Sequence, residues 1–223
     1  MTLRLLASAL ALALTTACLT TPVTQVESLG KGNSQFSLEP SFFTLAADSS
    51  VGGGRAFVPA LNLAGAFGVT DRFDLGARVG GSLYEVHAKL QLTPDGATIP
   101  VSIAPYGTFA AIGVGGAGAG YANLKVPVLL GFPIGERSQL VVGPSLSALS
   151  AGGGTTDANT GGAVFSVGMA LGLHAKINDS FALHPEVGAT VPFAFTTEAG
   201  SGSGDYGLTS FAFTLGLQFG TTK

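Results

Sequence analysis

Charged residues are scarce in this sequence. They make up only 10% of the 223 residues, whereas 46% are hydrophobic and 34 residues are glycine. In soluble domains about a quarter of all residues are charged, and these residues cover the surface. The composition therefore predicts that the outer face of the fold contacts a solvent other than water. The net charge of −3 and the absence of basic clusters exclude a nucleic-acid-binding role.

Cysteine is almost absent as well. The single residue, Cys18, excludes a disulfide framework within the chain and a cysteine-based zinc site. After the N-terminal segment no run of 18 or more apolar residues remains, so the sequence predicts no transmembrane helix. Apolar residues are abundant and regularly spaced, which argues against intrinsic disorder.

The first 17 residues have the pattern of a signal peptide. Arg4 supplies the positive charge, and residues 5–14 form an apolar run that is too short to span a bilayer. The sequence that follows, LTTAC, resembles the lipobox of bacterial lipoproteins, although Thr15 stands where leucine is usual. The resemblance implies that Cys18 is lipidated and becomes the mature N-terminus. The alternative is ordinary signal-peptide cleavage nearby with an incidental cysteine. Residues 18–34 are interpreted as a short polar tether.

The rest of the chain alternates apolar with small or polar residues, a period typical of β-strands with two different faces. Ten segments are long enough to cross a membrane as strands, which takes about 9–11 residues. They are 35–46, 56–69, 73–82, 83–92, 99–112, 123–132, 139–149, 163–177, 180–195 and 208–219.

The pattern predicts an all-β fold: a single antiparallel up-and-down transmembrane β-barrel spanning 35–223, with ten strands, or eight as the alternative. Long glycine-rich connections are expected at 47–55, 113–122, 150–162 and 198–206, and tight turns after the second, sixth and eighth strands. Alternating short and long connections are typical of outer-membrane barrels, with the short ones in the periplasm. An even number of strands places both termini on the periplasmic side.

Three segments resemble small outer-membrane β-barrel proteins of Gram-negative bacteria: GVTDRFDLGARV (68–79), NLKVPVLLGFPIGERSQLVVGP (123–144) and FAFTLGLQF (211–219). The last one resembles the C-terminal strand that the barrel-assembly machinery recognises, but here residues 220–223 follow Phe219. The resemblance implies an outer-membrane location. It also implies contact with outer-membrane lipid, with the barrel-assembly machinery and with the lipoprotein-processing machinery. It names no function and leaves the oligomeric state open.

Four prolines fall inside predicted strands: Pro40, Pro105, Pro144 and Pro185. Proline removes a hydrogen bond from a β-ladder, so it is rare in strand interiors. Each of these prolines has the parity of the outward face, which favours local bulges at a recurring depth. The alternative is that the prolines mark strand ends.

The opposite parity collects the titratable side chains on the inner face. The predicted lumen residues are Glu39, Asp74, Arg78, Glu85, His87, Lys89, Lys125, His174, Lys176, His184 and Glu186. Because buried charges need partners, one interpretation is a self-neutralising network that holds the barrel together. The other is a narrow polar pore, which the histidines could make pH-sensitive. The remaining inward residues are mostly small and are expected to leave space for water or a small ligand.

Catalytic signals are weak. Ser102, His87 and Glu85 could form a Ser/His/acid set on paper, but the sequence has no G-x-S-x-G elbow. The pairs His174/Lys176 and His184/Glu186 supply fewer ligands than a zinc site usually needs. The sequence therefore predicts neither an enzyme nor a cofactor or metal. It favours a porin-like barrel lipoprotein with a structural or narrow-pore permeation role, or alternatively a surface binding or adhesion module displayed on barrel loops.

Overall fold

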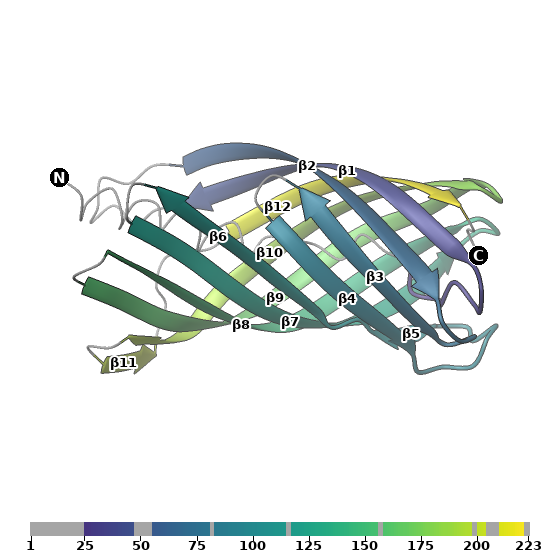
Figure 1. The fold of residues 1–223 in the computed structure, drawn as a ribbon. Coiled ribbons are helices and arrows are strands. Elements are labelled where there is room, and N and C mark those ends of the chain that lie inside the picture. The colour runs from purple at the N-terminus through teal and green to yellow at the C-terminus, as the bar shows by residue number, and fades with distance from the viewer. Residues whose placement is uncertain are drawn as a thin grey trace.

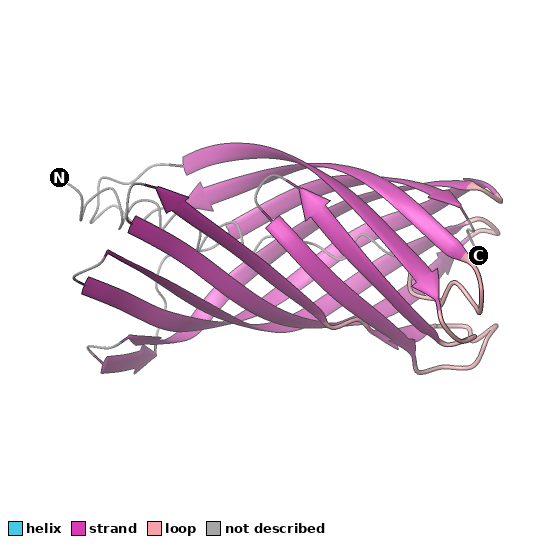
Figure 2. Ribbon diagram, in the orientation of Figure 1, coloured by secondary structure: helices cyan, strands magenta, loops and turns pink. Residues whose placement is uncertain are grey.

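The computed structural model describes residues 25–46, 55–80, 83–114, 117–155, 158–197, 200–203 and 210–220. These residues form strands joined by turns, and none of their segments is a helix that could cross a membrane. Figure 2 shows how completely strands account for the described chain. The predicted signal peptide and Cys18 lie outside the described residues.

The strands form one closed antiparallel barrel (Figure 1). Strand β12 pairs with both β10 and β1, which closes the sheet. Strands β5 and β6 together count as one strand of the wall, because both pair with β4 on one side and β7 on the other. Strand β11 pairs only with the end of β10 and is not a separate wall strand. The wall therefore has ten strands, which confirms the predicted fold class. The bounds are β1 (Ser34–Ala46), β2 (Arg55–Gly68), β3 (Phe73–Gly80), β4 (Leu83–Gln91), β5 (Val101–Ile103), β6 (Tyr106–Val114), β7 (Ala117–Ile134), β8 (Ser138–Thr155), β9 (Ala158–Asn178), β10 (Phe181–Thr197), β11 (Gly200–Ser203) and β12 (Ser210–Gly220).

Tight turns gather at one end of the barrel, here called the turn end. The turns at 69–72, 135–137 and 179–180 lie there. Gly135 adopts a φ of 66°, a conformation that glycine enters without steric cost. The register pairs Gln35 with Gly220, so β1 begins at the turn end and β12 ends there.

Side chains alternate between the two faces of the wall because successive Cβ atoms of a strand point to opposite sides. In β12, Ala212, Thr214 and Gln218 are buried inside, whereas Phe211 and Phe213 are exposed outside. Every wall strand has large apolar residues on its outer face, among them Phe36, Leu63, Leu75, Val86, Phe109, Leu124, Leu146, Phe165, Val187 and Phe213.

The outer face carries no charge between the ends of the described strands, and Arg55, the first residue of β2, is the one strand-terminal charge with outward parity among them. Every Asp, Glu, Lys or Arg between the first and last residues of these strands has the inward parity. Within the described part of the chain, the segments at the turn end hold exposed charges, namely Lys31, Asp71, Arg72, Asp95, Glu136, Arg137 and Asp179. An uncharged apolar band is therefore bordered by a charged rim.

The four prolines behave in two ways. Pro40, Pro144 and Pro185 lie within strands and face outward, as their parity predicts. Each pairs with a residue of one neighbouring strand but has no partner on the other. Since proline lacks the N–H group, its strand loses pairing on one side only. Pro105 lies in the break between β5 and β6, so for this proline the strand-end alternative is correct.

The prediction of loops is wrong for two segments, which form strands instead. Residues 113–122 and 150–162 belong to the hairpins β6–β7 and β8–β9, apart from 115–116 and 156–157, which lie outside the described residues. Glycines face each other across both hairpins, as in Gly113↔Gly118 and Gly152↔Gly161. Glycine has low strand propensity, but it keeps both backbone hydrogen-bonding groups, so the ladder continues through it. Most of 47–55 and 198–206 lies outside the described residues, although 200–203 form β11.

Candidate functional site

The structure places the predicted lumen residues on the inner face of the barrel. Nine of them are buried: Glu39, Asp74, Arg78, Glu85, Lys89, Lys125, His174, His184 and Glu186. His87 and Lys176 have the same parity, and their side chains keep about a fifth of their surface exposed, 20% and 23%. The alternation alone was therefore enough to identify inward positions, and the structure adds which of them are brought together.

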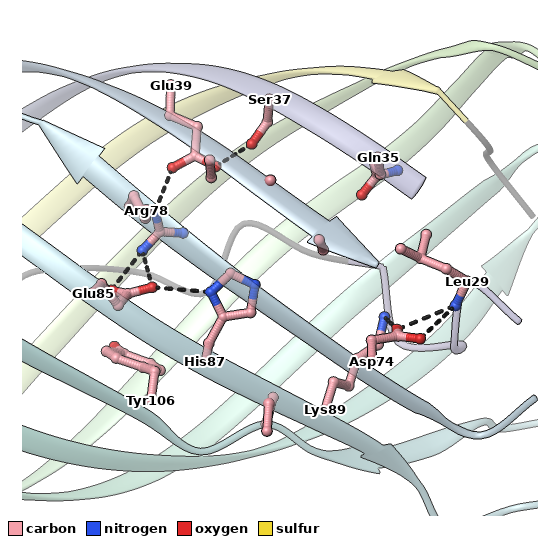
Figure 3. Close-up of a pocket in the computed structure, with 15 residues that line it drawn as sticks. Leu29, Gln35, Ser37, Glu39, Asp74, Arg78, Glu85, His87, Lys89 and Tyr106 are labelled. Atoms are coloured by element: carbon pink, nitrogen blue, oxygen red, sulfur yellow. Dashed lines mark hydrogen bonds and ion pairs between the residues drawn. The ribbon is translucent and has the colours of Figure 1, made fainter. Parts of the chain in front are cut away.

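Arg78 joins two carboxylates into one cluster (Figure 3). Its partner across the β3–β4 ladder is Glu85, and Arg78 Nη1 lies 2.9 Å from both carboxylate oxygens. Arg78 Nε lies 2.7 Å from Glu39 Oε2 on β1. To reach it, the guanidinium passes over β2 at Ala64, the β2 residue paired with Arg78. The planar guanidinium suits two carboxylates at once, and the pairing offsets the cost of burying the charges.

Two further groups lie on the inner face, one joined across two strands and the other including two residues of the same strand, β10. Asp74 and Lys89 face each other on β3 and β4, with 3.0 Å between Lys89 Nζ and Asp74 Oδ2. On the other side of the barrel, His184 Nε2 lies 3.3 Å from Glu186 Oε2, and the His184 ring lies 5.8 Å from that of His174 between centroids. Within the described part of the chain, no group of three or more potential ligands is placed to hold a metal ion.

Lysines outside these groups have different neighbours. Lys125 is buried, with its Nζ 6.0 Å from the centre of the Tyr106 ring. Lys176 lies at the turn end, where its Nζ is 3.1 Å from Asp179 Oδ1.

Inward glycines make room for the long lumen side chains. A Cβ atom at Gly76 would overlap His87 Nε2 and lie 2.5 Å from the Gly65 carbonyl oxygen. A Cβ atom at Gly172 would lie 2.6 Å from His184 Nε2. The expectation that small residues leave open space is therefore wrong at these positions, because neighbouring side chains lie across the glycines and fill it.

The N-terminal part of the described chain enters the turn end of the barrel. Residues 18–34 were predicted to be a tether, but Val26, Ser28 and Leu29 are buried at 0%, 0% and 1% exposure. We call residues 25–30 the strap. The tether prediction is wrong for this described portion, because the strap finds polar and apolar partners on the lumen wall.

The wall binds the carbonyl groups of the strap through two side chains. Lys89 Nζ donates to the carbonyls of Gln25 and Glu27, at 3.1 and 2.6 Å. Ser102 Oγ donates to the carbonyl of Val26 at 2.5 Å. The sequence offered Ser102 for a Ser/His/acid set, but in the structure its hydroxyl is hydrogen-bonded to the strap.

The wall also accepts hydrogen bonds from the strap. Asp74 accepts from the Leu29 N–H, at 3.2 and 3.1 Å to its two oxygens, and from Ser28 Oγ at 2.6 Å. Gln91 Oε1 accepts from the Ser28 N–H at 2.8 Å, and Gln139 Oε1 from the Val26 N–H at 3.5 Å.

Apolar packing and a glycine contact complete the site. The Val26 side chain belongs to a buried cluster with Ala104, Leu129 and Val141. Where the strap leaves the lumen, a Cβ atom at Gly68 would overlap the Gly30 carbonyl. Glycine at position 68 is therefore what lets the strap lie so close to β2.

Sequence reasoning missed three strap-binding residues: Gln91, Ser102 and Gln139. Gln91 and Ser102 are buried on the inner face, but uncharged polar residues on that face are common and carry no signal of their own. The available signal was Val26 and Leu29, two of the large apolar residues in a segment that was read as polar.

A cavity of about 40 Å³ lies between the strap and the Arg78 cluster. Leu29, Asp74, Arg78 and His87 are among its lining residues (Figure 3). A site of this volume holds a few water molecules, whereas small-molecule sites usually measure about 300–1,000 Å³.

Comparisons with known proteins identify no family. No family profile and no curated protein matches the chain. Among solved structures, the attachment invasion locus protein Ail of Yersinia pestis is 12% identical, with 85% of this chain and 99% of that one covered and a TM-score of 0.40. Neisserial surface protein A is 7% identical, with 83% and 96% covered and a TM-score of 0.46. The outer membrane protease OmpT of Escherichia coli is 9% identical, with 88% and 99% covered and a TM-score of 0.46. None of the three assigns a role to this chain.

Replacing Arg78 with methionine should destabilise the barrel strongly. The substitution leaves Glu39 and Glu85 buried without their cation, and breaking such a group costs about 3–5 kcal/mol. Lys176→Met is the matched control, because its partner Asp179 is exposed and such pairs contribute about 1 kcal/mol or less. Urea unfolding in detergent micelles measures both. Equal losses in the two variants would contradict the assignment of the Arg78 cluster as a stabilising group.

Adding one methyl group at Gly76 should also destabilise the barrel. Gly76→Ala drives the Cβ into His87 and the Gly65 carbonyl, and overpacking of this kind costs about 1–3 kcal/mol. Gly107→Ala is the control, since a Cβ there has no neighbour within 4 Å. The same unfolding assay compares them. If both variants unfold at the wild-type midpoint, the lumen is looser than described.

Proposed function

We propose that this protein is an integral outer-membrane β-barrel of a Gram-negative bacterium with a structural role and no catalytic one. The observation that carries the proposal is the apolar outer face of all ten wall strands, which is uncharged between the strand ends and bordered by charged segments at the turn end. A monomer in water rarely exposes so large a contiguous apolar surface. Closure by β1 and β12 also satisfies the backbone groups of the strand edges, which a bilayer requires.

A structural role is favoured over permeation by what fills the lumen. Ion pairs link β1, β3 and β4, side chains lie across the inward glycines, and the strap occupies the turn end. These features argue against a continuous water path. The narrow-pore role is the competing possibility, and electrical recording separates the two.

Conductance is the direct test of the structural role. Purified full-length protein inserted into planar bilayers should give no ion-conducting steps, because the strap and the ion pairs fill the lumen. A verified porin recorded in the same bilayers confirms that steps are detectable. Regular steps from the wild-type protein would favour the narrow-pore role instead.

If the outer face contacts lipid, a charge introduced there should impair folding into a bilayer by an amount that depends on its depth. Leu63 is 57% exposed and pairs with both Leu38 and Val79 along the wall. Arginine near the middle of a bilayer costs a barrel about 2–4 kcal/mol, and close to the interface about 0–1. We therefore expect Leu63→Arg to lower folding into phospholipid vesicles strongly and Val69→Arg, in the turn at 69–72, to lower it little.

Gel migration of unheated samples measures this folding, because folded barrels resist unfolding in cold detergent. Equal folding yields for the two arginine variants would contradict the membrane setting.

The proposal includes a lipid on Cys18. Outer-membrane barrels have their short turns in the periplasm, which would place the turn end there. The seven residues 18–24 span at most roughly 25 Å, so they are long enough to link the strap to the inner leaflet. Cells grown with a labelled fatty acid should incorporate the label into wild-type protein and not into Cys18→Ala. Label in both proteins, or in neither, would remove the anchor from the proposal.

A surface-binding role is the second candidate, and the long hairpins favour it. Strands β7, β8 and β9 have 18, 18 and 21 residues, about twice what a tilted strand needs to cross a bilayer. Their ends away from the turn end would project beyond the membrane. Replacing residues 152–161 with a two-residue Asn-Gly turn should leave the folded barrel intact. A loss of whole-cell binding to immobilised extracellular-matrix proteins in that variant would favour this second role.

A further inference from the structure

The turn end of the lumen recognises peptide backbone. Five wall side chains, from β3, β4, β5 and β8, form hydrogen bonds with six backbone groups of residues 25–29. Three of these groups are N–H donors and three are carbonyl acceptors. The wall residues are Asp74, Lys89, Gln91, Ser102 and Gln139.

The strap is held by side chains and is not part of the sheet. Among the described residues, the backbone hydrogen bonds between this region and β2 begin only at Gly32 and Asn33, which bond to Gly68. Residues 26–30 make none with the wall strands. Removing the strap would therefore leave the ladders of the barrel intact.

The site keeps its charges paired without the strap. Asp74 and Lys89 lie 3.0 Å apart and would remain an ion pair. The departure of the strap would thus leave no isolated buried charge, which is the largest cost that could otherwise hold it in place.

A glycine hinge connects the strap to β1. Gly30 and Gly32 have φ values of 81° and 82°, and a Cβ at Gly32 would meet nothing within 4 Å. Lys31 between them is exposed. Glycines of this kind absorb large changes of backbone direction with little steric cost.

We propose that the turn end of the lumen is a binding site for a short peptide segment, and that the strap is a displaceable occupant supplied by the same chain. Its ligand is a short peptide that bends as residues 26 and 27 of the strap do and carries a β-branched apolar residue, one spacer residue, a serine and a leucine, as in Val26 to Leu29. The apolar residue fits the pocket of Ala104, Leu129 and Val141. The inference goes beyond the structural role, and it rests on the proposed function only for its membrane setting.

Cysteine accessibility in detergent tests whether the strap is seated. In a Cys18→Ala background, Leu29→Cys should react with a maleimide at least ten times more slowly than Lys31→Cys, because Leu29 is buried and Lys31 is exposed. Adding Asp74→Ala and Lys89→Ala should raise the rate at position 29 at least fivefold. Lys176→Ala with Asp179→Ala is the control pair at the same end and should not raise it.

Peptide binding tests whether the site accepts a ligand in trans. In a full-length variant, residues 25–30 are replaced with Gly-Ser-Gly-Ser-Gly-Ser, which preserves chain length. A fluorescent, capped peptide Gln-Val-Glu-Ser-Leu-Gly should bind this variant, as measured by polarisation, and should not bind the wild type. Asp74→Ala with Lys89→Ala in the variant should weaken binding at least tenfold.

Each adverse outcome overturns the proposal. Equal labelling rates at positions 29 and 31 would mean that the strap is not seated. A strap-replacement variant that shows no heat-dependent shift in gel migration would mean that the strap is needed to form the barrel and is not displaceable. A folded variant that does not bind the peptide would mean that the wall does not recognise it. All three measurements are made in detergent, so a wrong membrane assignment would not affect them.

Discussion

The pairing of β1 with β12 is the interaction on which the rest of the structure depends. It joins the first wall strand to the last and removes the two open edges that a ten-strand sheet would otherwise present. Closure also defines an inside. Only in a closed wall can Glu39 on β1 meet Arg78 on β3 away from bulk water, and only there can the strap have a lumen to enter.

The strand register gives the closed wall an apolar outer face and a polar inner face. A shift of one residue along any ladder would turn every side chain of that strand to the other face. It would place apolar residues in the lumen and charged residues against the outer surroundings. The cross-strand pairs Asp74–Lys89 and Arg78–Glu85 resist such a shift, because they form only when β3 and β4 align as they do. The ion pairs of the lumen therefore specify alignment as well as contributing stability.

Alternation in the sequence was enough to predict the ten-strand barrel and the inward position of residues such as Glu39, Arg78 and Glu85. It could not predict which inward groups meet, because the contact between Arg78 and Glu39 reaches over an intervening strand. The glycine hairpins were missed because their strand character comes from their partners and not from their own propensity. The strap was missed because residues 25–30 have no periodicity, and their position depends on side chains from four separate strands.

The strap also has a consequence for the order of assembly. Its contacts come from Asp74, Lys89, Ser102 and Gln139, which are far apart in sequence and lie side by side only after β3 to β8 have been laid into the wall. The first described residues of the chain can therefore find their places only after much later segments have arrived. The strap therefore has no complete binding surface until β3 to β8 have paired.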